Sequence, residues 1–76
     1  MKIIINGVEK IVSGGEVNYE WVVKDMLGYD PKHVFSVTYA VKRNDGSKVE
    51  GIMSPTSKYI KLEEGMRFSC YYTGNA

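Results

Sequence analysis

The order of the expected elements constrains this chain more than any single residue, because 76 residues must hold a hairpin, a helix and further strands. The chain opens with a β-branched run that stops at Asn6-Gly7. Asn-Gly supplies the positive φ angles of a two-residue type I′ turn. This turn places Ile5 opposite Val8, with Ile3 on the same face, and predicts that these three side chains are buried.

One amphipathic helix is expected over residues 19–27. Apolar residues recur there at the spacing of a single helical face: Tyr19, Val22, Val23, Met26 and Leu27. Asn18 is the candidate N-cap and Gly28 the candidate C-terminal stop. At about 100° of rotation per residue, Trp21 points away from the apolar stripe.

Further strands are expected at residues 34–42, 49–53 and 66–73, with a short edge strand at 59–62, because apolar and polar residues alternate there. One helix cannot cover two separate sheets, so the sequence predicts an α+β fold with a single mixed sheet of four to five strands packed on that helix. The first and last strands are expected to be central and parallel. The predicted core is Ile3, Ile5, Val22, Val23, Met26, Val37, Phe68 and Cys70.

Composition argues against several classes of partner. Ten Lys and Arg residues nearly balance nine Asp and Glu residues, and the lysines are scattered rather than clustered. Nucleic-acid-binding proteins usually carry a basic stripe, so no nucleic-acid partner is expected. The apolar run at the start is too short for a signal peptide or a membrane span. The expected compartment is the cytoplasm, with no membrane partner.

The sequence predicts no active site and no cofactor. His33 and Cys70 are the single residues of their kinds, so the usual nitrogen and sulfur ligands cannot assemble a metal site. Cys70 alternates with Phe68 and Tyr72, which favours a small buried side chain over a reactive thiol. No glycine-rich phosphate loop is present either. The chain is therefore expected not to be an enzyme.

Two features are candidates for binding a partner. Small or apolar side chains are expected on the sheet face that points away from the helix, which would give either a flat docking surface or an ordinary half-polar face. Trp21 is either an exposed anchor for a partner or packs on the loop at 28–31. The candidate partner-binding residues are Ile4, Thr38, Ala40, Ser69, Tyr71 and Trp21, with Ser36 on the same face.

Four segments carry a family resemblance. They are Ile-Ile-Ile-Asn-Gly-Val at 3–8, Asn-Tyr-Glu-Trp-Val-Val-Lys-Asp-Met-Leu-Gly at 18–28, Phe-Ser-Val-Thr-Tyr at 35–39 and Glu-Gly-Met-Arg-Phe-Ser at 64–69. With them the chain resembles bacterial ubiquitin-like domains of the multiubiquitin type and their single-domain relatives. The resemblance covers nearly the whole chain and implies a β-grasp (ubiquitin-like) fold, with residues 1–76 as one domain.

The resemblance also implies a function. Relatives of this kind are encoded in operons with activating, conjugating and deconjugating enzymes, some of them linked to defence against phage. It implies that the domain is activated at its C-terminus, carried as a thioester on partner cysteines and transferred to a target protein. Gly74, Asn75 and Ala76 would then form a flexible conjugation tail.

The C-terminal sequence leaves alternatives open. The chain ends in Gly74-Asn75-Ala76 instead of Gly-Gly, and this end is a processed end, a precursor tail or a boundary introduced by cloning. A protein modifier is the leading hypothesis. The second is a non-covalent β-grasp interaction module, which needs no special C-terminus. A sulfur carrier comes third, because its chemistry needs the missing Gly-Gly.

Overall fold

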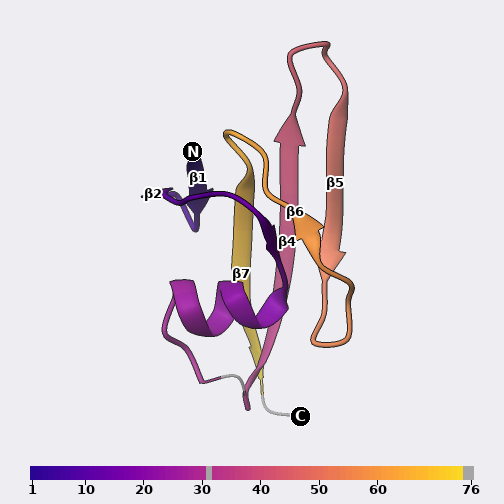
Figure 1. Ribbon diagram of the computed structural model, residues 1–76. Helices are drawn as coiled ribbons and strands as arrows, with labels where there is room; N and C mark the ends of the chain where they lie inside the picture. The colour runs from indigo at the N-terminus through magenta and orange to yellow at the C-terminus, as the bar shows by residue number, and fades with distance from the viewer. Residues whose placement is uncertain (31, 75–76) are drawn as a thin grey trace.

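The computed structural model describes residues 1–30 and 32–74 and has an α+β architecture (Figure 1). A mixed five-stranded sheet has the order β2-β1-β7-β4-β5. Its strands are β1 (Lys2–Ile5), β2 (Val8–Ile11), β4 (Val34–Lys42), β5 (Lys48–Met53) and β7 (Arg67–Gly74). The one described helical segment packs on one face of the sheet, against the central strand β7. The predicted mixed sheet on one helix is confirmed.

The opening hairpin has the predicted register. Ile5 lies opposite Val8, and the turn residues Asn6 and Gly7 have φ angles of 50° and 80°. Ile3 and Ile5 are buried as predicted, but Val8 is 56 % exposed. The burial prediction for Val8 is wrong because β2 is the outermost strand, and the helix packs against the centre of the sheet.

The parallel pairing of β1 with β7 holds the sheet together at its centre, as the sequence predicted. The Ile4 N–H donates to the Met66 carbonyl at 2.9 Å, and the Asn6 N–H donates to the Phe68 carbonyl at 3.0 Å. The Asn6 side chain then bonds twice to the backbone of Cys70. Its Oδ1 accepts from the Cys70 N–H at 2.8 Å, and its Nδ2 donates to the Cys70 carbonyl at 3.2 Å.

These two side-chain bonds replace strand pairing that β1 cannot supply. β1 ends at Ile5, whereas β7 continues to Gly74, so the backbone groups of Cys70 that face β1 have no neighbouring strand. Interior backbone groups are almost always paired, because leaving one unpaired away from water costs the free energy of a hydrogen bond. The Asn6 amide fills this role, since it offers one donor and one acceptor like a peptide group.

The predicted helix is present, but its winding differs from the predicted α-helix. Asn18 Oδ1 accepts a hydrogen bond from the Trp21 N–H at 3.0 Å, which is the predicted N-cap contact. Residues Trp21–Met26 form a π-helix, η1, in which the Leu27 N–H bonds to the Val22 carbonyl five residues earlier. The chain leaves the helix at Gly28, whose φ is 70°.

The π-winding changes where Trp21 points. Trp21 is half-buried and meets Phe68 edge-on, with ring centroids 6.3 Å apart and an interplanar angle of 62°. The prediction that Trp21 points away from the core is therefore wrong. A π-turn contains more residues than an α-turn, so the rotation per residue assumed for the sequence does not apply. Trp21 helps to cover the core.

A second, two-stranded sheet was not predicted. β3 (Glu16–Val17) pairs antiparallel with β6 (Ile60–Lys61), so the expectation of a single sheet is too simple. The Leu62 N–H also donates to the Gly15 carbonyl at 2.9 Å. These pairings bring Val17 and Leu62 into the core, where they are 4 % and 3 % exposed. The small sheet therefore extends the core beyond the helix.

The predicted core is confirmed except at Met26, which is half-buried and packs against the edge of the core. Tyr19 is buried, and its hydroxyl accepts a hydrogen bond from the Phe35 N–H at 3.1 Å, which ties the helix to the start of β4. The buried side chains are Ile3, Ile5, Val17, Tyr19, Val22, Val23, Val37, Val41, Met53, Leu62, Met66, Phe68 and Cys70.

Asn6→Gly tests the contribution of the Asn6 side chain to stability. Glycine adopts the positive φ of the turn but removes both bonds to Cys70, so we expect the free energy of unfolding to fall by about 1–3 kcal/mol. Urea unfolding measures the change. Asn44→Gly, in the turn between β4 and β5, is the matched control and is expected to have a smaller effect. Equal losses for the two variants would contradict a special role for Asn6.

Candidate functional site

The sheet face opposite η1 gathers side chains from four strands. The register places Thr38 between Ser69 on β7 and Ile52 on β5. One step along, Ala40 lies between Arg67 and Glu50, and Ile4 lies beside Arg67 on the other side. We call this surface the outer face and define it by Ile4, Ser36, Thr38, Ala40, Glu50, Ile52, Arg67, Ser69 and Tyr71.

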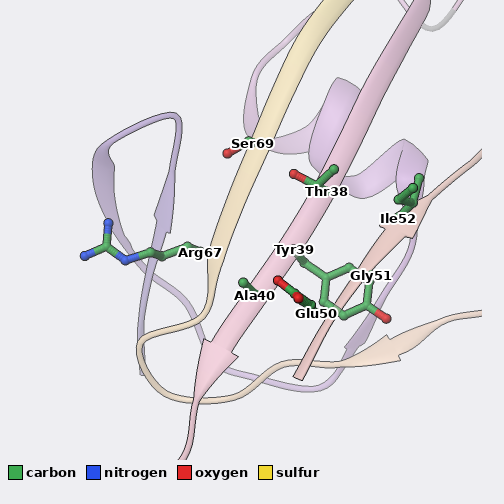
Figure 2. A pocket seen from close by; sticks show the side chains of 8 residues that line it. All are labelled: Thr38, Tyr39, Ala40, Glu50, Gly51, Ile52, Arg67 and Ser69. Atoms are coloured by element: carbon green, nitrogen blue, oxygen red, sulfur yellow. The ribbon is translucent and has the colours of Figure 1, made fainter. Parts of the chain in front are cut away.

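An open hollow of about 480 Å³ lies on the outer face over β7, β4 and β5 (Figure 2). Its middle is low because Thr38, Ala40 and Ser69 have small side chains. Ile52 stands on the β5 side and is 74 % exposed. Arg67 extends from β7 away from β4 (Figure 2). A partner side chain placed in this hollow would meet hydroxyls and methyl groups, with an isoleucine on one side and a guanidinium on the other.

Gly51 bounds the hollow at β5, and the Tyr39 side chain lies close to it. Tyr39 and Gly51 are opposite each other, and the Tyr39 ring reaches across Gly51 (Figure 2). A Cβ at position 51 would lie 2.6 Å from the Tyr39 hydroxyl oxygen and 2.8 Å from Cζ, too close for either atom. Tyr39 also faces Phe68, with ring centroids 6.5 Å apart. Gly51 therefore leaves the space in which Tyr39 covers the core.

The candidate binding residues from the sequence do not all lie together. Ile4, Thr38, Ala40 and Ser69 share the outer face, and Tyr71 lies further along it, 63 % exposed and opposite Ser36. Trp21 lies on the other side of the sheet against Phe68, so it does not belong to this surface.

Three residues of the outer face were missed by the sequence prediction: Glu50, Ile52 and Arg67. The available signal was the alternation within β5 and β7, in which these residues have the outward phase.

The expected tail lies only partly in the described structure. Gly74 is the last residue of β7 and lies opposite Val34. Thr73 Oγ1 donates to the Val34 carbonyl at 3.0 Å, next to a register shift between Val34 and Phe35. Asn75 and Ala76 lie outside the described residues. β7 thus carries the chain to within two residues of its last position.

The charges around the outer face differ in whether they are paired. Lys2 lies 3.6 Å from Glu9, and Lys48 lies 3.3 Å from Glu50, both as exposed pairs. Exposed pairs of this kind contribute little to stability. Arg67 forms no ion pair with any residue in the described part of the chain. Its guanidinium is therefore a charge of this face that an acidic partner group can reach without displacing a carboxylate.

The adjacent carboxylates Glu63 and Glu64 have structural partners. Arg43 Nε and Nη2 each donate to Glu63 at 3.0 Å, which fixes the end of β4 to the turn before β7. This contact raises the pKa of Arg43 and lowers the pKa of Glu63. Glu64 accepts from the Lys2 N–H at 2.9 Å. Neither carboxylate is arranged for acid–base catalysis.

The described residues offer no catalytic thiol and no metal cluster. Cys70 is 6 % exposed, and burial raises the pKa of its thiol, so the nucleophilic thiolate is disfavoured at neutral pH. His33 lies in the exposed segment before β4, with its ring 5.7 Å from that of Tyr72. Residues 1–30 and 32–74 contain no group of three or more His, Cys, Asp or Glu residues placed to bind a metal ion.

No family model, curated protein or solved structure matches this chain. Among the described residues, no helix has both the length and the apolar character needed to cross a membrane.

Gly51→Ala tests the packing of Tyr39. The new methyl group displaces the ring, and we expect a loss of about 1–3 kcal/mol in the free energy of unfolding. Tyr39→Ala removes the obstacle, so adding Gly51→Ala to that variant should cost much less. A double-mutant cycle by urea unfolding measures the coupling. Additive effects of the two substitutions would rule out this contact.

The burial of Cys70 predicts slow reaction with a disulfide reagent. We expect the native protein at neutral pH to react at least about tenfold more slowly than the urea-unfolded protein, because the thiol must first become exposed. Absorbance of the released thiolate measures both rates. Similar rates in the two states would mean that Cys70 is accessible in the folded protein.

Proposed function

We propose that this chain is a β-grasp, ubiquitin-like protein modifier that is joined to target proteins through its C-terminus. The observation that carries the proposal is the position of the last strand. β7 lies at the centre of the sheet, parallel to β1, and ends at Gly74. A C-terminal carboxylate beyond this strand would follow directly on a central strand of the sheet.

The strand order supports the fold assignment. In the order β2-β1-β7-β4-β5, the β1–β2 hairpin and the β4–β5 hairpin lie on either side of the central strand β7, which is parallel to β1, and one helix packs on one face. This is the arrangement that a β-grasp domain requires and that the resemblance to bacterial ubiquitin-like domains implies. The helix is short and π-wound, so it covers less of the sheet than a longer α-helix would.

The proposed reaction takes place on partner enzymes. An activating enzyme joins the C-terminal carboxylate to the AMP portion of ATP with release of pyrophosphate. A partner cysteine thiol then displaces AMP to form a thioester, and a target amine attacks the thioester to form an amide and release the thiol. The chain itself contributes the carboxylate and a surface for recognition. A buried Cys70 suits this role, since a protonated thiol does not compete for the activated carboxylate. The proposed setting is a cytoplasmic bacterial conjugation system that acts in antiphage defence.

The outer face is the proposed recognition surface. It combines exposed Ile52 and Tyr71 with small central residues and the guanidinium of Arg67. An exposed isoleucine on β5 and an arginine on β7, with small side chains of β4 between them, suit a partner segment that carries an apolar side chain and a carboxylate at separate positions. This observation also favours the second candidate function, a non-covalent interaction module that uses the same surface without conjugation.

Removal of residues 74–76 separates the two functions. The test incubates the chain with ATP and a cognate activating enzyme, and intact mass spectrometry detects the covalent enzyme adduct. We expect the full chain to form the adduct and the truncated chain to form none, while circular dichroism shows that both are folded. Gly74→Trp is expected to block the adduct as well. Adduct formation by the truncated chain would falsify the modifier proposal.

Ile52→Glu tests the outer face. If Ile52 contacts the activating enzyme, the affinity of this chain for that enzyme should weaken by about thirtyfold or more, which is about 2 kcal/mol. Val8→Glu is the matched control, because Val8 is also an exposed β-branched residue on an edge strand but lies on the opposite side of the sheet. Calorimetry measures both affinities. Equal effects of the two variants would exclude the outer face as the recognition surface.

A further inference from the structure

Asn6-Gly7 combines a chemically reactive pair with a structural role, and the proposed function uses neither. Both polar atoms of the Asn6 amide bond to the backbone of Cys70, and the side chain is otherwise exposed to water. We propose that Asn6 is a site of spontaneous deamidation that the folded state protects, so that the reaction proceeds when the β1–β2 hairpin separates from β7.

The reaction needs only water. The backbone nitrogen of Gly7 attacks Cγ of Asn6, a new carbon–nitrogen bond closes a five-membered imide, and the Cγ–Nδ2 bond breaks with release of ammonia. Water then opens the imide at either carbonyl and leaves aspartate or isoaspartate. Glycine at the following position favours the attack, because no Cβ obstructs its nitrogen and its backbone rotates freely.

The native geometry opposes the first step. The attack requires Cγ of Asn6 to approach the Gly7 nitrogen in a near-attack arrangement. In the folded protein the amide is held at 2.8 Å and 3.2 Å by Cys70, and the φ angles of 50° and 80° fix the turn. Both hydrogen bonds must break before the amide can rotate. Protection therefore follows from the same contacts that join the hairpin to β7.

Either product prevents the original contacts from forming again. An aspartate places a carboxylate oxygen, which cannot donate, against the Cys70 carbonyl that accepted from Nδ2. An isoaspartate adds a carbon atom to the main chain of a two-residue turn whose length sets the β1–β2 register. A chain that deamidates while the β1–β2 hairpin is separated from β7 is therefore less able to refold. The fraction of deamidated chains then increases with the time that the hairpin has spent separated.

The test compares deamidation in native and urea-unfolded protein at the same temperature and neutral pH. Peptide mapping by mass spectrometry follows Asn6, with Asn18 as an internal control because a bulky Tyr19 follows it. We expect conversion of Asn6 to be at least about tenfold slower in the native protein, because reaction waits for opening. Equal rates in the two states, or no conversion in the unfolded chain, would overturn the proposal.

A destabilised variant tests whether folding controls the rate. Tyr19→Phe removes the hydroxyl that bonds to Phe35 and leaves the residues of the hairpin turn unchanged. We expect the native-state conversion of Asn6 to rise in proportion to the increase in the unfolded fraction measured with urea. A conversion rate that stays constant while stability falls would show that folding does not control the reaction and would reject the proposal.

Discussion

The amide of Asn6 bonded to the backbone of Cys70 is the contact on which the centre of the fold depends. β1 is four residues long and β7 is eight, so their parallel pairing ends before the longer strand does. The Asn6 side-chain amide pairs with the Cys70 N–H and carbonyl in place of a further β1 residue, while the Asn6 backbone turns toward β2. One residue thereby sets the hairpin turn, fixes β1 against β7 and pairs backbone groups that the core would otherwise leave unpaired.

Local sequence patterns predicted most of the elements but not how the helix is wound. The Asn6-Gly7 turn predicted the register of the first hairpin, because that turn type permits one pairing. The apolar stripe predicted burial of Val22 and Val23. It misplaced Trp21, since no feature of the sequence distinguished a π-turn from an α-turn. The short strand predicted at 59–62 is present as β6, but its partner β3 was missed, because a two-residue strand is too short to show alternation.

For the candidate site, the sequence predicted which side chains face outward but not how neighbouring strands align. Alternation within β4 and β7 predicted that Thr38, Ala40 and Ser69 face outward together. The places of Ile52 and Arg67 beside them depend on how β5 and β7 align with β4, which a pattern within one strand does not specify. The hollow thus forms only when β4, β5 and β7 are aligned in the sheet. Its small central residues indicate a hollow only when the larger residues on the neighbouring strands are known.

The parallel course of β1 and β7 also determines where the molecule can be extended. Parallel strands start at the same end of a sheet, so the chain enters through β1 beside the start of β7 and leaves from the opposite end of β7 (Figure 1). The long dimension of the domain is 40 Å. Segments fused before β1 and after β7 would therefore join the domain at opposite ends of the parallel pair. A reporter protein placed ahead of Met1 would likewise sit remote from Gly74 and leave that end unobstructed.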